Sequence, residues 1–149
     1  MKKVYLAASF AYSSKEKTEA RKSLIGKIEE LLKEKNLEVY VPHKHKIPNA
    51  WDMSMTEWSR RVFEMDKDAL DECDILLFLS FGKENNSGAV WECGYAYGKN
   101  IPVVTVRMTK DVESLMVTGG SHAVIDESRL KDYDFDEMPV VYDEPETQS

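Results

Sequence analysis

The chain has 149 residues, of which 42% are hydrophobic and 32% charged, an ordinary balance for one globular domain. Its net charge of −7 argues against a broad footprint on a phosphate backbone, so we expect no nucleic acid partner. No apolar run approaches the length that spans a bilayer, so we expect no membrane contact. Cys73 and Cys93 have neither zinc-site nor disulfide-framework spacing, which favours a reduced, cytoplasmic setting.

Strand-like and helix-like patterns alternate in the first half of the chain. The apolar run 4–8 predicts a first strand, and Ser13 or Ser14 can cap the helix that follows. Residues 37–41 predict a second strand, which Pro42 stops. The sequence therefore opens with a strand, a helix and a strand.

The alternation continues through the middle of the chain. Thr56 begins an amphipathic helix that carries Leu70, and residues 75–79 form an apolar run typical of a buried strand. Ser87 can cap the next helix, and Gly98 can end it. A third strand and a third helix are thus expected.

The last part of the chain completes the pattern. Residues 102–106 predict a fourth strand, 111–116 a short helix and 123–125 a final strand. The order predicts an α/β fold, a three-layer, flavodoxin-like doubly wound sheet of about five mostly parallel strands with helices on both faces. We expect a single domain over 1–142 and an acidic, flexible tail over 143–149.

One carboxylate, Glu92, stands among small, apolar and aromatic residues in SGAVWECGYAYGKN, close to a predicted helix start. Ligands of such sheets bind beyond the carboxyl ends of the strands, where this segment falls. The chain lacks the GxGxxG, GxxxxGK[ST] and GxSxG motifs, which disfavours a dinucleotide site, a P-loop and a serine hydrolase. Glu92 is then either a solvated acid that complements the helix dipole or a sheltered nucleophile.

Several motifs resemble the nucleoside 2-deoxyribosyltransferase family. The segment SGAVWECGYAYGKNIPVV looks like the central motif of the family, and VYLAASF looks like its first strand. MDKDALDECDILL resembles the helix that precedes the third strand, and LMVTGGSHAVID and RLKDYDFDEMP resemble the closing segments. The resemblance covers most of the chain in the right order.

The resemblance implies a reaction and roles for three residues. Glu92 matches the nucleophile that attacks the anomeric carbon of a 2'-deoxynucleoside and holds the deoxyribose as a covalent ester until another nucleobase accepts it. Tyr5 matches the tyrosine that orients the nucleophile, and Asp66 matches the aspartate that binds and protonates the base. This is the logic of a retaining glycosidase with a base as acceptor. The family chemistry implies no cofactor and no metal.

Two departures from the family pattern concern the sugar's 5' end. This chain has Asn86 where transferases carry an aspartate, and Ser114 where they carry an asparagine contributed by a neighbouring subunit. In both respects it resembles the related 2'-deoxynucleoside 5'-monophosphate N-glycosidases, in which water accepts the sugar. An aspartate would repel a phosphate, whereas Asn and Ser can donate hydrogen bonds. Hydrolysis of 2'-deoxynucleotides is therefore the alternative function, and a homo-oligomer with shared sites is expected.

Other positions complete the expected substrate site. Ser87 and Gly88 lie in the central motif, and Phe10 faces either the base or the core. Lys46 replaces a glutamine that orients the base in transferases; with His45, it either alters base or phosphate recognition or belongs to a solvated loop. The three histidines lack metal-ligand spacing, so a metal site is not expected. A nucleotide-binding module without catalytic activity is a third hypothesis.

Overall fold

The core of the molecule is a five-stranded sheet in the order β2-β1-β3-β4-β5. The computed structural model describes residues 1–9, 14–84 and 86–145. All four neighbouring strand pairs are parallel. This order is that of a flavodoxin-like doubly wound sheet, which confirms the predicted fold class. The strands are β1 (Lys3–Ala7), β2 (Glu38–Tyr40), β3 (Ile75–Ser80), β4 (Val103–Arg107) and β5 (Ala123–Asp126).

Helices connect the strands, and serine residues cap three of them. The hydroxyls of Ser14, Ser54 and Ser114 accept hydrogen bonds from backbone N–H groups in the first turns of the helices that follow. Such caps satisfy donors that a helix start otherwise leaves unpaired. The α-helices are α1 (Lys15–Glu34), α2 (Met55–Asp71), α3 (Ser87–Gly98) and α4 (Leu115–Gly120), and the 3-10 helices are η1 (Pro42–Lys44), η2 (Ala50–Asp52) and η3 (Glu127–Asp132).

Two predicted helix starts were wrong in detail. Ser87 is the first residue of α3, and the N-cap position belongs to Asn86. The short helix predicted over 111–116 begins only after Ser114, because the Ser114 hydroxyl accepts from a first-turn N–H and Arg107 holds Glu113 in a buried ion pair just before it. A side-chain cap and a buried ion pair therefore set the start of α4.

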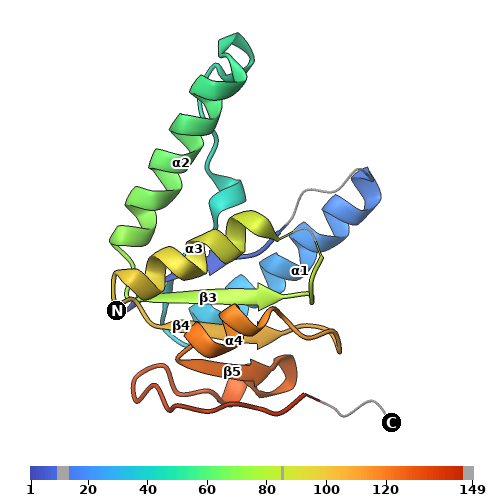
Figure 1. Cartoon of the computed structure of the whole chain (residues 1–149), viewed down its shortest axis with the longest axis vertical. Coiled ribbons are helices and arrows are strands. Elements are labelled where there is room, and N and C mark those ends of the chain that lie inside the picture. The colour runs from blue at the N-terminus through green and yellow to red at the C-terminus, as the bar shows by residue number, and fades with distance from the viewer. Residues whose placement is uncertain (10–13, 85, 146–149) are drawn as a thin grey trace.

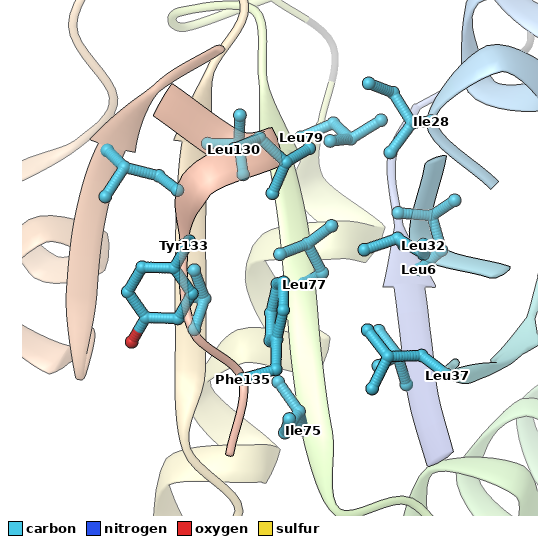
Figure 2. Close-up of a cluster of buried hydrophobic side chains, with 14 of the residues drawn as sticks. Leu6, Ile28, Leu32, Leu37, Ile75, Leu77, Leu79, Leu130, Tyr133 and Phe135 are labelled. Carbon is cyan, nitrogen blue, oxygen red and sulfur yellow. The ribbon is translucent and has the colours of Figure 1, made fainter. Parts of the chain in front are cut away.

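The alternation of side chains along β1 divides the core into two faces. Val4 and Leu6 point to the face that α1 covers, where they pack with apolar residues of β3, η3 and the segment after it (Figure 2). Tyr5 and Ala7 point to the opposite face, which α3 and α4 cover together with the end of α2. Figure 1 shows α3 and α4 side by side across this face. The alternation thus aims Tyr5 toward α3.

Helix α2 stands away from the sheet (Figure 1), and Leu70 near its C-terminal end is its buried residue. Its outer part and η2 carry exposed apolar side chains, among them Trp51 and Met55. Within the ranges described, no helix combines the length and apolarity needed to cross a membrane.

The chain after η3 returns to the edge strand. Tyr142 forms an isolated parallel bridge with Val124 of β5, and Asp143 accepts hydrogen bonds from Arg129 and from the backbone N–H of Asp126. Ordered contacts therefore reach Asp143, the first residue of the predicted tail. The division into a domain and a flexible tail stays a prediction.

Candidate active site

A cavity of about 490 Å³ opens between the end of β1, α2 and the N-terminal half of α3. It lies beyond the carboxyl ends of the strands, beside the β1–β3 pair where the strand order reverses, which is where such sheets bind ligands. Its walls combine aromatic, aliphatic and polar groups. The lining residues are Ala8, Ser9, Pro42, Phe63, Asp66, Lys67, Leu70, Asn86, Ser87, Gly88, Ala89, Trp91 and Glu92.

Glu92 is the half-buried acid of this cavity. It lies in the second turn of α3, and its carboxylate accepts a hydrogen bond from the phenol of Tyr5, which is fully buried on β1. Burial raises the pKa of Glu92 to about 7; the Tyr5 hydrogen bond opposes this shift, and the charge of Asp66 adds to it. Burial and Glu92 together keep the pKa of Tyr5 well above its usual value, so its phenol stays a donor.

Asp66, on α2, forms the second acidic group of the cavity. The phenol of Tyr40, the last residue of β2, donates to Asp66 Oδ1 over 3.4 Å. Burial raises the pKa of the Asp66 carboxyl, while the Tyr40 hydrogen bond and the nearby His45 lower it. The charge of Asp66 also raises the pKa of Glu92, as expected for two carboxylates in one half-dry site.

The two tyrosines that serve these acids are neighbours in the sheet. Tyr5 and Tyr40 are register partners on β1 and β2, and their rings stack with centroids 5.3 Å apart. The His45 ring stacks on the other side of Tyr40, with centroids 4.3 Å apart and an interplanar angle of 10°. The site therefore holds two tyrosine–carboxylate pairs side by side.

Five of the residues predicted from the sequence line the cavity: Glu92, Asp66, Asn86, Ser87 and Gly88. The Asn86 amide donates to the carbonyl of Gly82 over 3.2 Å, and no described side chain caps the start of α3. Ser87 and Gly88, the first two residues of that helix, line the cavity, and their N–H groups have no partner within the helix.

The other predicted residues lie elsewhere. Tyr5 stands behind Glu92, while His45 and Lys46 are exposed and outside the cavity lining. Ser114 caps α4 and does not line the cavity of its own chain. Phe10 falls outside the described residues. The structure thus brings the two acids and the start of α3 together at the wall, with Tyr5 behind Glu92, and leaves His45, Lys46 and Ser114 outside the lining.

Sequence reasoning missed several residues of the wall. Phe63 and Trp91 line it and meet edge to face, with ring centroids 5.2 Å apart, and Trp91 is 49% exposed. Aromatic residues on a helix more often pack in a core or an interface than against a substrate, so neither residue is among the predicted site residues. The sequence predicts residues 37–41 only as a strand, with no role for Tyr40. If β1 and β2 are assumed to pair, a second tyrosine beside Tyr5 would have indicated a second site residue.

No three His, Cys, Asp or Glu side chains among the described residues are grouped so that they could hold a metal ion. The polar atoms of the cavity are carboxylates, an amide, hydroxyls and one lysine. Their chemistry suits acid, base and nucleophilic steps on a small polar ligand.

Solved structures resemble this chain in fold. A 2-deoxyribosyltransferase from the psychrotolerant bacterium Bacillus psychrosaccharolyticus superposes with a TM-score of 0.80 and 26% identity, over 93% of this chain and 97% of that one. A conserved protein from Enterococcus faecalis V583 is 20% identical with a TM-score of 0.56, over 83% of this chain and 81% of that one, a likeness of fold alone. None of the curated proteins compared with the chain matches it.

The model of the nucleoside 2-deoxyribosyltransferase family matches residues 4–131, a stretch that holds Tyr5, Asp66 and Glu92 together with the five-stranded sheet. An enzyme of nucleoside deoxyribosyl transfer needs a cavity at the ligand edge of that sheet with acidic groups to act on a glycosidic bond, and the fold provides one. Since the match spans most of the chain and a solved 2-deoxyribosyltransferase shares its fold over nearly its whole length, the chain belongs to the nucleoside 2-deoxyribosyltransferase family and is a transferase or N-glycosidase.

Proposed function

We propose that this enzyme cleaves the N-glycosidic bond of a 2'-deoxynucleoside through a covalent deoxyribosyl-Glu92 intermediate and passes the sugar to a second nucleobase. The proposal rests on the pairing of Glu92 with Tyr5 at the wall of the cavity that also holds Asp66. Membership of a family of enzymes leaves the binding-only reading without support.

The first step uses the two acids in different protonation states. Glu92, ionised, attacks the anomeric carbon as the bond from that carbon to the base nitrogen breaks, and a glycosyl ester forms. The departing base takes a proton from Asp66, because a leaving nitrogen that would otherwise carry negative charge departs more readily when protonated. The Tyr5 phenol fixes the carboxylate of Glu92 and leaves its other oxygen to react.

The second step reverses the first with a new base. The acceptor nitrogen attacks the anomeric carbon of the glycosyl ester, the bond from that carbon to the Glu92 oxygen breaks, Glu92 leaves as a carboxylate, and Asp66 takes the proton that the acceptor loses, so configuration at the anomeric carbon is retained. Phe63 and Trp91 give the wall two aromatic rings on which a nucleobase can stack. A stacking wall favours a base over water as acceptor.

Hydrolysis of 2'-deoxynucleoside 5'-monophosphates is the second candidate function. A specific arrangement favours it: the neutral Asn86 and the uncapped start of α3, with Ser87 and Gly88, line the cavity. Backbone N–H groups at a helix start and a neutral amide tolerate a phosphate that an aspartate would repel. In this case, water accepts the sugar from Glu92.

Two incubations separate the candidates. Deoxyadenosine with cytosine should yield deoxycytidine and adenine if the enzyme is a transferase, whereas each 2'-deoxynucleoside 5'-monophosphate in water should release its base if it is a hydrolase. Glu92→Ala should abolish either activity, and mass spectrometry of the wild type quenched without acceptor should find Glu92 carrying one deoxyribosyl group. If the wild type releases no base in either assay, both proposals fail.

We further propose a homo-oligomer in which Ser114 enters the cavity of a neighbouring subunit. Ser114 stands at the start of α4 beside Leu115 and Met116, which are 79% and 76% exposed in the single chain. Burial of such side chains against a second copy is favourable. Light scattering should give a mass above that of one chain.

A mixing experiment tests whether sites are shared. In this arrangement, Glu92→Ala and Ser114→Asp should each disable the enzyme when present in every subunit. A mixed pair of subunits still forms one intact site, with Glu92 from the Ser114→Asp subunit and Ser114 from the Glu92→Ala subunit. Mixing the two variants after partial unfolding should restore activity to about a quarter of the wild type at most. No recovery from confirmed mixed oligomers would contradict a shared site.

We also place the enzyme in nucleoside salvage in the cytoplasm, in keeping with its sequence.

A further inference from the structure

Tyr40 donates a hydrogen bond to Asp66, as Tyr5 does to Glu92, yet nothing in the reaction described so far uses Tyr40. We propose that Tyr40 is a positioning residue that fixes the carboxyl of Asp66 and makes it a stronger acid toward the departing base. This inference rests on the proposed role of Asp66 as the proton donor. Three observations carry it, namely a hydrogen bond, a double ring stack and a strand register.

The hydrogen bond joins Tyr40 Oη to Asp66 Oδ1 over 3.4 Å. A phenol that donates to a carboxyl group stabilises the ionised form more than the neutral form. Asp66 lies in a half-buried environment that by itself would make the group hold its proton too tightly to release it. The Tyr40 phenol counteracts that effect, and its own pKa is raised to about 12, chiefly by burial, so it remains a donor at any working pH.

The ring stack fixes where that phenol points. Tyr5 packs on one side of the Tyr40 ring and His45 on the other, at centroid distances of 5.3 and 4.3 Å. The residue is also held by β2, where it is the register partner of Tyr5. A side chain clamped on both faces loses little freedom when it forms its hydrogen bond, so Asp66 receives a preorganised donor.

The charged and titratable groups around Asp66 come from four elements. Tyr40 and Tyr5 face it from β2 and β1, Glu92 faces it from α3, and His45 approaches after η1. Lys67, its neighbour on α2, is engaged with Asp71 at 3.1 Å. Of these groups, Tyr40 is the one with a hydrogen bond to Asp66 among the described residues.

The test is the pH profile of kcat/KM for Tyr40→Phe, which keeps the stacked ring and removes the hydroxyl. Glu92 must be ionised and Asp66 must be protonated, so each carboxyl group contributes one limb of the profile. Loss of the donor should move the Asp66 limb up by about 0.5 to 1 pH unit, leave the Glu92 limb in place, and lower the maximum about threefold. Tyr5→Phe should instead move the other limb.

Tyr133→Phe is the matched control, because the Tyr133 phenol is buried on the other face of the sheet and donates to the carbonyl of Pro139 over 2.8 Å. It should leave both limbs unchanged. A second variant, His45→Gln, removes one ring of the stack and should move the same limb in the same direction as Tyr40→Phe. It keeps the inference testable if Tyr40→Phe does not fold.

A substrate comparison isolates the proton transfer. Both substrates carry a 5'-hydroxyl or a 5'-phosphate, whichever the wild type accepts. Cleavage of 2'-deoxyguanosine needs a proton on the leaving base, whereas the 7-methyl derivative already has a cationic base, which leaves as a neutral molecule without a further proton. Tyr40→Phe should slow the first reaction and leave the second within about twofold of the wild type. Equal losses on both substrates, or a Tyr40→Phe profile that overlays the wild type, would overturn the inference. Absence of base release by the wild type would instead overturn the proposed function.

Discussion

Glu92→Gln should stabilise the protein while it abolishes turnover. In the folded chain the pKa of Glu92 is raised to about 7, chiefly by burial, from an ordinary value of 4.5. The native state therefore binds more protons than the unfolded state between those two values, and the wild type loses stability as pH rises through that window. Gln has the same length, can still accept from Tyr5, and does not ionise.

The magnitude follows from the two pKa values. The proton linkage destabilises the wild type by about 1 kcal/mol at pH 5 and about 3 kcal/mol at pH 8. Urea unfolding followed by tryptophan fluorescence should therefore give Glu92→Gln a higher midpoint than the wild type, with a gap that widens from pH 5 to pH 8. Both proteins should have the same m-value, because the surface exposed on unfolding does not change.

Glu30→Gln is the control, since Glu30 is an exposed position of α1. Its small effect on the midpoint should be the same at both pH values. A gap between Glu92→Gln and the wild type that stays constant with pH, or a wild type that is the more stable protein at pH 8, would refute the reasoning that Glu92 is an acid held in an unfavourable setting.

Three further predictions concern the same site and its support. The wild-type kcat/KM should show a limb with an apparent pKa near 7, because burial raises the pKa of Glu92 to about 7 and the nucleophile must be ionised; a flat profile between pH 5 and 8 would contradict this. Trp91→Ala should raise the KM for the acceptor base about tenfold with a smaller change in kcat, as loss of one stacking ring predicts, and Tyr97→Ala, outside the cavity lining, serves as its control in steady-state kinetics. Glu113→Gln breaks a buried ion pair with Arg107 and should lower the unfolding free energy by about 3 kcal/mol in denaturant titrations, whereas Glu57→Gln, in an exposed pair with Arg61, should change it by less than about 1 kcal/mol.

The fold could be predicted from the sequence because each strand and helix carries a local signal. The β3 residues are buried along their whole length and read as one apolar run, as the centre of a parallel sheet requires. The position of Ser114 relative to α4 could not be read in this way. The start of that helix depends on the Arg107–Glu113 ion pair, which joins β4 to the loop and leaves no periodic trace in the sequence.

The residues of the candidate site show the same difference between local signals and tertiary contacts. Glu92 and Asp66 were identified through motifs around them, and the cavity contains both. Tyr40 could not be predicted as a site residue because its position beside Tyr5 depends on the pairing of β2 with β1, and strand order cannot be read from the residues of a single strand. Trp91 could not be predicted as a site residue because an aromatic residue on a helix usually packs into the core, whereas Trp91 is exposed and lines the cavity.

Two carboxylates in one cavity need some asymmetry if one is to attack and the other is to donate a proton. The phenol partners do not supply this asymmetry, since each acid accepts a hydrogen bond from one tyrosine. The difference lies in what else surrounds them. Asp66 has His45 nearby, which favours its ionised form, while Glu92 has only the Tyr5 hydrogen bond to oppose its burial. In the free enzyme both groups therefore compete for one proton, and a cationic leaving base or a bound phosphate would change which of them holds it. In the proposed mechanism, the substrate then helps to set the two roles, and Tyr5 and Tyr40 fix where each acid stands.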